Sequence, residues 1–124
     1  MSANAATDSN SNPIGVQPNT NVVVASLVLA FAAPAAHKAF VIGHFSADPA
    51  GATGGIMVAG ILMNGNLMMD TQVNNLQGNT GTLLSLSGVI PVTPGKHRFE
   101  LQAFDANMTS ASVHHRSLTV IDLG

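Results

Sequence analysis

The sequence predicts an all-β fold, an antiparallel β-sandwich built as a single domain. From residue 22 onwards apolar and polar residues alternate with a period of two, which is the spacing of a strand. Asn64-Gly65 separates two such runs and is a strong hairpin signal, because both turn positions favour positive φ. No stretch combines a helical period with capping residues. At 124 residues the chain has the mass for one hydrophobic core.

Seven strands are expected along the chain, separated by loops rich in Gly, Pro, Asn or Asp. Their ranges are 22–31, 38–47, 56–63, 66–73, 82–90, 96–104 and 113–123. The first of them is apolar in both phases of the alternation, which is typical of a strand covered on both faces. Short strands at this spacing, with a turn after each, indicate a sandwich or a jelly roll.

The clearest single strand follows the Pro94-Gly95 turn, in the segment PGKHRFELQAF. One set of alternate residues is His97, Phe99, Leu101 and Ala103, and the other is Arg98, Glu100 and Gln102. One buried face and one polar face account for this pattern completely. We therefore interpret the segment as a strand that carries no chemistry of its own.

Residues 1–21 differ in composition from the rest of the chain, being polar and rich in Asn, with Pro13 and Pro18. Such a segment buries too little apolar area to offset the entropy lost when it becomes ordered. We therefore expect an extended polar N-terminal arm at 1–21, held by a neighbouring subunit, and a single β-sandwich (jelly-roll) domain at 22–124. An arm ordered against its own domain is the alternative.

Charged residues make up only 8% of the chain, against roughly 25% in average soluble proteins, while hydrophobic residues make up 46%. A small domain with so little charge tends to associate, so part of its surface is expected to be a subunit contact. The net charge of −2 excludes the dense positive face that nucleic-acid binding needs. The absence of cysteine excludes disulfides and thiolate metal sites.

The apolar run at 22–36 is interpreted as a strand rather than as a signal peptide or a membrane span. A signal peptide needs a positive region before its apolar segment, and residues 1–21 contain no Lys or Arg. A spanning helix needs about 20 apolar residues, whereas this run is shorter and Pro34 interrupts its end. We expect neither a signal peptide nor a membrane segment.

No catalytic or cofactor constellation is present, so we expect no enzymatic activity and no cofactor. The chain has no Cys and no G-x-S-x-G elbow to provide an activated nucleophile. Asp70, Glu100 and Asp105 are spread along the sequence and do not define a carboxylate pair. The glycine-rich GATGG at 51–55 lacks the Lys-Ser/Thr of a phosphate-binding loop.

The five histidines are the candidate metal ligands. His114 and His115 are adjacent, and adjacent strand residues point to opposite faces, so this pair is not expected to chelate one metal. His37, His44 and His97 are interpreted as packed or solvent-facing strand residues, and no metal site is assigned. A ring of one of these three around a symmetry axis, able to hold a metal or an anion, is the alternative.

The C-terminal third, VIPVTPGKHRFELQAF at 89–104 with RSLTVIDLG at 116–124, resembles the ending of small trimeric jelly-roll domains. These are the tumour-necrosis-factor-like and complement-like heads of bacteriophage tail and capsid-decoration proteins. The run AFVIGHFSAD with GGIMVAGILMNGNLM is similar to the middle of such a domain, so the resemblance covers 22–124. Immunoglobulin-like modules end in a similar strand pair.

The resemblance implies a structural virion protein of a bacteriophage, a capsid decoration or cement protein whose homotrimeric knob stabilises contacts between coat subunits. It places the protein on the capsid surface after synthesis in the host cytoplasm, with copies of itself and the major coat protein as partners, and with neither nucleic acid nor membrane. The methionines around Asn64-Gly65 either fill the core or form subunit contacts. The implied contact residues are Val22, Val24, Leu27, Leu29, Met57, Met63, Met68 and Met69.

Two other functions stay open beside this one. The first is a receptor- or carbohydrate-binding tail or fibre head, although such a module normally exposes Trp or Tyr, and the chain has neither. The second is an immunoglobulin-like adhesion module, which is expected to be monomeric. The mass of the protein in solution separates this second class from the trimer.

Overall fold

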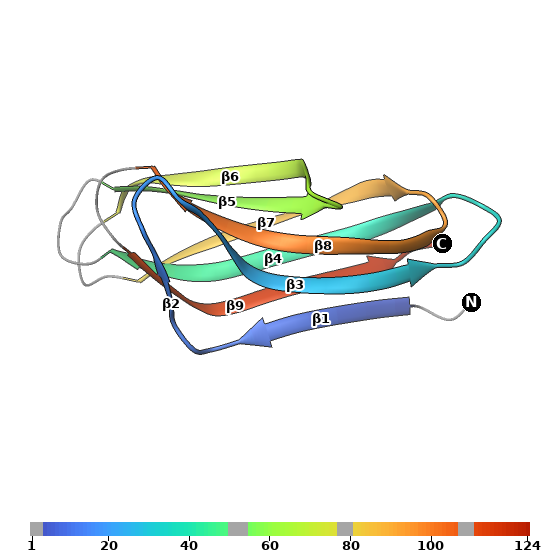
Figure 1. Ribbon diagram of the computed structural model, residues 1–124, viewed down its shortest axis with the longest axis horizontal. Helices are drawn as coiled ribbons and strands as arrows, with labels where there is room; N and C mark the ends of the chain where they lie inside the picture. The colour runs from blue at the N-terminus through green and yellow to red at the C-terminus, as the bar shows by residue number, and fades with distance from the viewer. Residues whose placement is uncertain (1–3, 50–54, 77–80, 107–110) are drawn as a thin grey trace.

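The computed structural model describes residues 4–49, 55–76, 81–106 and 111–124, and most of them lie in β-strands (Figure 1). The strands are β1 (Asn4–Asn10), β2 (Ile14–Val16), β3 (Asn21–Phe31), β4 (His37–Pro49), β5 (Gly55–Met63), β6 (Asn66–Leu76), β7 (Thr82–Val92), β8 (Gly95–Asp105) and β9 (Ala111–Asp122). Within these ranges no helix is long and apolar enough to cross a membrane. The predicted all-β fold is confirmed, and each of the seven predicted strands ends within three residues of its expected bounds.

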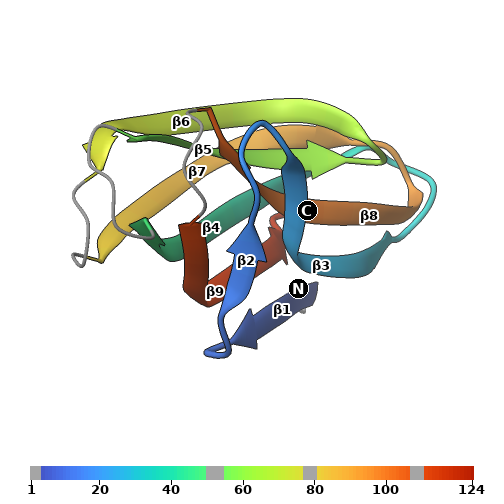
Figure 2. The ribbon, with the colours of Figure 1, turned by 60° about the vertical axis from the view of Figure 1, so that its left-hand side comes forward.

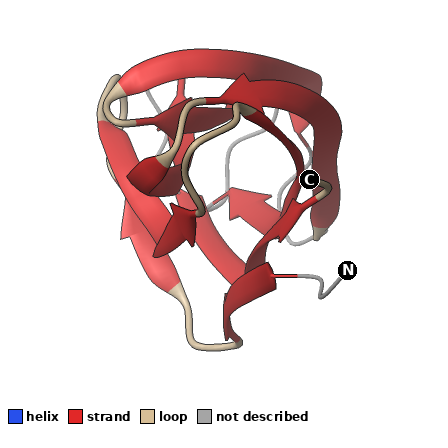
Figure 3. Ribbon diagram, turned by 90° about the vertical axis from the view of Figure 1, so that its right-hand side faces the viewer, coloured by secondary structure: helices blue, strands red, loops and turns tan. Residues whose placement is uncertain are grey.

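The strands form two sheets that pack face to face (Figure 2, Figure 3). Sheet A has the order β1-β9-β4-β7, with β2 also paired to β9, and sheet B has the order β3-β8-β5-β6. From β3 onwards the chain changes sheet at every connection except the β5–β6 hairpin. This crossing pattern is that of a jelly roll. It differs from the ABED and CFG sheets of an immunoglobulin domain, so the immunoglobulin-like alternative does not fit the topology.

The segment 1–21, for which we expected an arm outside the domain, contributes two strands to sheet A. Strand β1 pairs with β9 from Asn4 opposite Asp122 to Asn10 opposite Arg116, and β2 continues along β9. The pairing uses backbone groups, so it needs few apolar side chains, and it covers an edge of β9 that would otherwise present unpaired N–H and C=O groups. The described part of this segment therefore belongs to the sandwich.

The apolar sequence of β3 predicted a strand covered on both faces, and this prediction is wrong. Strand β3 lies at the edge of sheet B, and its outer face is partly open to solvent. Its outer residues Val23 and Val28 are 40% and 57% exposed. A bulge between Val23 and Ala25 turns both Val24 and Ala25 inward, where both are buried. Because a bulge places two consecutive residues on one face, it accounts for part of the apolar run.

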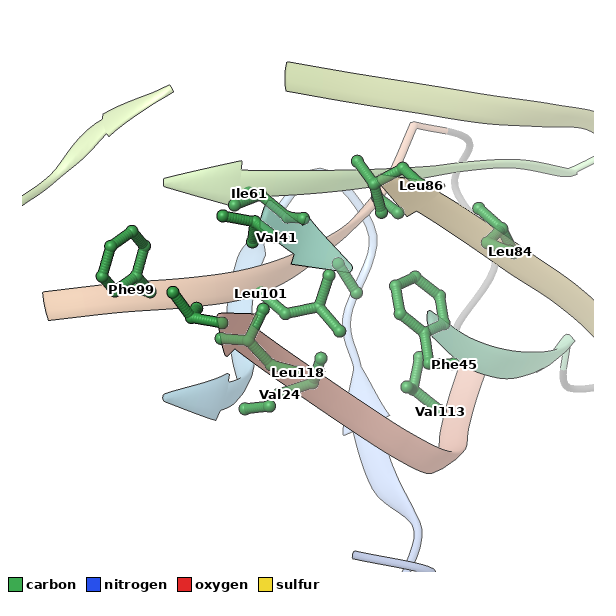
Figure 4. Packing of buried hydrophobic residues seen from close by; sticks show 14 of the residues in the cluster. Val24, Val41, Phe45, Ile61, Leu84, Leu86, Phe99, Leu101, Val113 and Leu118 are labelled. Atoms are coloured by element: carbon green, nitrogen blue, oxygen red, sulfur yellow. The ribbon is translucent and has the colours of Figure 1, made fainter. Parts of the chain in front are cut away.

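The core lies between the two sheets and is filled by the inward-facing side chains of both (Figure 4). Residues of this core that Figure 4 labels are Val24, Val41, Phe45, Ile61, Leu84, Leu86, Phe99, Leu101, Val113 and Leu118. At Gly43 in β4 an added Cβ would lie 2.9 Å from Leu101 Cδ1 and 3.4 Å from Ile61 Cδ1. Packing of these two side chains from sheet B therefore requires a residue without a side chain at this position.

The predicted hairpin at Asn64-Gly65 is confirmed, since both residues have positive φ, 53° and 84°. The side chain of Asn64 also ties the turn to β8. Its Oδ1 accepts a hydrogen bond from the backbone N–H of Arg98 (3.0 Å), and its Nδ2 lies 2.8 Å from Nδ1 of His97. The amide thus acts as a bridge between the β5–β6 hairpin and the neighbouring strand.

Candidate association face

The outer face of sheet A, which is the side turned away from the core, carries three rows of aligned side chains that cross all four main strands. In register, the rows are Ala5, Ile121, Phe40 and Val89; Thr7, Thr119, Ile42 and Ser87; and Ser9, Ser117, His44 and Ser85. Alternation along β4 places them outward, because Val41 and Phe45 point into the core. The first row is apolar, the second is mixed, and the third consists of serines and His44.

No Asp, Glu, Lys or Arg occurs in these three rows. The apolar row is only partly covered by its own sheet, since Val89 is 54% exposed while Phe40 and Ile121 are half-buried. Leu83, one row beyond Ser85 on β7, is 65% exposed. The centre of a protein interface is depleted of charged residues and contains apolar and aromatic side chains. The three rows have this composition, and the next outward row, beyond Phe40 and Val89, carries the exposed Lys38 opposite Pro91.

The polar part of the face includes one pair of hydroxyls that already bond to each other. The hydroxyls of Thr7 on β1 and Thr119 on β9 lie 3.0 Å apart and form a hydrogen bond across the strands. Burying a polar group that is already hydrogen-bonded within the sheet costs less free energy than burying one without a partner. This pair can therefore be covered by another protein at low cost.

A partly buried ion pair joins the strand ends beside the apolar row. Nδ1 of His37, at the start of β4, lies 2.8 Å from Oδ1 of Asp122, at the end of β9, and Nε2 lies 2.7 Å from the carbonyl oxygen of Ala32. These two acceptors raise the pKa of the His37 imidazole above 6.5. Burial favours the neutral acid of Asp122, but hydrogen bonds from His37 and from the Gly124 N–H lower the pKa of its carboxyl below 3.8.

A bulge shapes the polar end of the face. The register of β4 and β9 shifts between His44 and Ser46, and His115 in the bulge has a φ of 53°. A hollow of about 350 Å³ opens there. It is lined by Ser9, Asn10, Ser11, His44, His115, Arg116 and Ser117. Arg116 is buried, and its Nη1 donates a hydrogen bond to the carbonyl of Asn12 (2.6 Å).

The histidines do not form one cluster. The rings of His114 and His115 lie 5.4 Å apart, centre to centre, and are tilted by 44°. His37 belongs to the ion pair at the strand ends, His44 to the outer face of sheet A, and His97 to sheet B. In the part of the chain that the structure describes, no three His, Asp or Glu side chains are grouped so that they could hold a metal ion.

The contact residues implied by the resemblance lie elsewhere than on this face. Val24, Leu29 and Met57 are buried in the core of the chain itself. The others pack against that core and are partly buried: Val22, Leu27, Met63, Met68 and Met69. Val24, Leu29 and Met57 are thus covered by the chain itself, whereas the other five keep part of their surface exposed and stay predicted contact residues. The apolar row on the outer face of sheet A had a short signal in the sequence, because residues 39–43 (AFVIG) are apolar in both phases of the strand alternation.

No family model matches the chain, and no curated protein matches it. Solved structures match it by fold. A chain from the structure of the infectious bursal disease virus Gt strain superposes with a TM-score of 0.61 at 19% identity, over 96% of this chain and 32% of that one. The infectious bursal disease virus VP2 subviral particle gives 0.60 at 13% identity, over 97% and 32%. This chain thus spans about a third of the virus chains it matches.

Two other solved structures match this chain over most of their own length as well. Eiger TNF from S. frugiperda superposes with a TM-score of 0.60 at 6% identity, over 98% of this chain and 92% of that one. The sugar-binding EclA C-terminal domain gives 0.52 at 13% identity, over 90% and 79%. The protein is therefore a jelly-roll β-sandwich of the kind found in tumour-necrosis-factor-like and viral proteins, which is the predicted fold class.

Proposed function

We propose that the protein is a structural component of a bacteriophage particle, a capsid decoration or cement protein that associates through the outer face of sheet A. The observation that carries the proposal is the set of three uncharged rows on this face, with Phe40, Ile42, Ile121 and Val89 aligned across three strands. The likeness of the fold to chains of infectious bursal disease virus particles supports a place in a shell. The resemblance of the C-terminal third to the ending of trimeric jelly-roll heads supports three copies per knob.

The mechanism is association without chemistry. Burial of apolar surface contributes about 25 cal/mol per Å², and a stable interface buries roughly 1,200–2,000 Å² in total. The three rows of the outer face of sheet A are the surface that the association would bury. In a particle, each knob contacts several neighbouring coat subunits, so individually weak contacts are strengthened by the high effective concentration. The partners are copies of this chain and the major coat protein, at the capsid surface.

The test is the mass of the protein in solution, measured by light scattering on the wild type and on two matched variants. Val89 on sheet A and Val28 on sheet B are equally exposed, 54% and 57%, so a carboxylate at either position has the same access to water in the monomer. We expect a trimer for the wild type, a monomer for Val89→Glu and a trimer for Val28→Glu. A monomeric wild type, or a trimer that survives Val89→Glu, contradicts the proposal.

A further inference from the structure

The opposite side of the molecule, the outer face of sheet B, carries a second hollow that the association proposal does not use. It has a volume of about 380 Å³. Its lining residues come from all four strands of the sheet: Asn21, Val58, Gly60, Leu62, Leu67, Asp70, Gln102 and Phe104. This volume lies within the range of small-molecule sites, about 300–1,000 Å³.

Gly60 creates the floor of this hollow. In register across the sheet, Gln102 on β8 lies opposite one side of Gly60, and Asp70 on β6 lies opposite the other. Since Gly60 has no side chain, the carboxylate and the amide flank an open position. A Cβ at Gly60 would lie 3.0 Å from Leu67 Cδ1, the end of an exposed side chain that leans over the floor.

The neighbouring rows supply two apolar walls. Phe104 and Val58 lie opposite each other on β8 and β5 in the row on one side of Gly60, with Asn21 of β3 beyond them. Leu62 and Leu67 lie opposite each other on β5 and β6 in the row on the other side. The site therefore has hydrogen-bonding groups on its flanks and apolar surface at its ends.

The polar groups are available to a ligand. In the described part of the chain, the side chains of Asn21, Asp70 and Gln102 have no hydrogen-bond or ion-pair partner. Together they offer carboxylate and amide oxygens that accept hydrogen bonds and amide N–H groups that donate them. A ligand that matches this set must both donate and accept.

We propose that this hollow binds a neutral saccharide. The hydroxyl groups of a sugar donate to Asp70 and accept from the amides of Gln102 and Asn21, and its C–H surface packs against Phe104 and Val58. An anion is disfavoured by the Asp70 carboxylate, and a cation would leave the amide N–H groups and the apolar walls unused. The site and the association face lie on opposite sides of the sandwich, so a particle-bound knob keeps the site open to solvent.

The experiment uses the full chain on an array of neutral oligosaccharides, followed by calorimetric titration of the glycan that binds most strongly. We expect binding by the wild type. Asp70→Asn removes the charged acceptor and Gly60→Val fills the floor. Each is expected to weaken binding by about tenfold or more, the cost of losing a hydrogen bond to a charged group or the space that the ligand occupies.

Two substitutions on the same sheet are the matched controls. Glu100→Gln changes a carboxylate next to the hollow that does not line it, and Gln72→Ala removes an amide outside it. Both are expected to keep the affinity within about twofold, as for ordinary surface substitutions. The absence of any neutral glycan ligand overturns the inference, and so does glycan binding that persists in both Asp70→Asn and Gly60→Val. A trimer without glycan binding contradicts this inference alone and leaves the proposed association intact.

Discussion

His37 and Asp122 join the first residue of β4 to the last residue of β9 through a 2.8 Å contact between Nδ1 and a carboxylate oxygen. The other ring nitrogen faces the carbonyl of Ala32 at 2.7 Å. Because both ring nitrogens face acceptors, the doubly protonated imidazolium donates two hydrogen bonds, whereas the neutral ring donates one. His37 therefore holds two parts of the chain together: the loop after β3, through the Ala32 carbonyl, and the end of β9, through Asp122.

This pair predicts a pH dependence of stability. The raised pKa of His37 means that its contribution is complete below 6.5 and is lost as the pH rises through the folded-state pKa. The lowered pKa of Asp122 means that its contribution is complete above 3.8 and is lost as the pH falls. The pair thus stabilises most between these two values. We expect the stability difference between wild type and His37→Gln in urea to be larger at pH 5.5 than at pH 9.

The control for this measurement is His115→Asn. His115 is exposed and has a φ of 53°, a conformation that Asn tolerates well, so this variant removes an imidazole without straining the backbone. Its stability difference from the wild type should be the same at both pH values. A difference for His37→Gln that does not change with pH shows that the pair is not linked to protonation.

The contact between Asn64 and His97 predicts an energetic coupling between the β5–β6 turn and β8. The amide Nδ2 can only donate, so Nδ1 of His97 accepts (2.8 Å) and Nε2 carries the proton donated to the carbonyl of Thr93 (2.8 Å). Asn64→Gly keeps the turn conformation and removes both side-chain hydrogen bonds, which should cost about 1–2 kcal/mol. A double-mutant cycle with His97→Ala measures the coupling. Additive effects would show that the bridge contributes nothing.

The close packing of sheet B against Gly43 predicts that a side chain at this position destabilises the protein. A Cβ at Gly43 meets Leu101 at 2.9 Å in the closed core, so Gly43→Ala should destabilise the protein by about 1–3 kcal/mol. Gly15 in β2 has no atom within 4 Å of an added Cβ, and Gly15→Ala is the matched control. The control should be neutral or slightly stabilising, because it restricts the unfolded chain. Equal chemical denaturation midpoints for the two variants would contradict the close packing at Gly43.

Strand β1 predicts that removal of residues 1–12 destabilises the domain. The deletion exposes the β9 edge, removes the Asp8 carboxylate that accepts from the Ser26 N–H (2.8 Å), and removes the Asn12 carbonyl bonded to buried Arg116. We expect a loss of at least about 2 kcal/mol in chemical denaturation. Thr7→Pro, which restricts the backbone in the middle of β1 without shortening the chain, should act in the same direction. Unchanged stability in both variants means that β1 is dispensable.

The proposed association through the three uncharged rows of sheet A predicts an oligomer that is insensitive to salt. Interfaces that depend on charge weaken as the Debye length shortens, from about 10 Å at 0.1 M to 3 Å at 1 M. Burial of Phe40, Ile121 and Val89 does not depend on this screening. The mass measured by light scattering should therefore stay constant from low to high sodium chloride. Dissociation at high salt would assign the contact to another, charged surface.

The strands and the turn were predictable because their causes are local. A period of two along β8 needs only neighbouring residues, and the positive φ of Asn64 and Gly65 needs only their own preferences. The pairing of β1 was not predictable, because β1 is held by its backbone, and backbone groups are the same in every sequence. The low content of charged residues likewise indicated association, but it could not show which surface of the protein takes part.

The sequence by itself determined the class of fold, the positions of its strands and the scarcity of charge. Tertiary structure decided which face of the short run 39–43 is buried, because AFVIG is apolar in both phases; in the fold Val41 is buried and Phe40 lies half-buried on the outer face. It also brought Asp70 and Gln102 to either side of Gly60. The register between strands brings together residues that are distant in the chain. The rows on sheet A and the hollow on sheet B both depend on this register, and no local sequence motif predicts either of them.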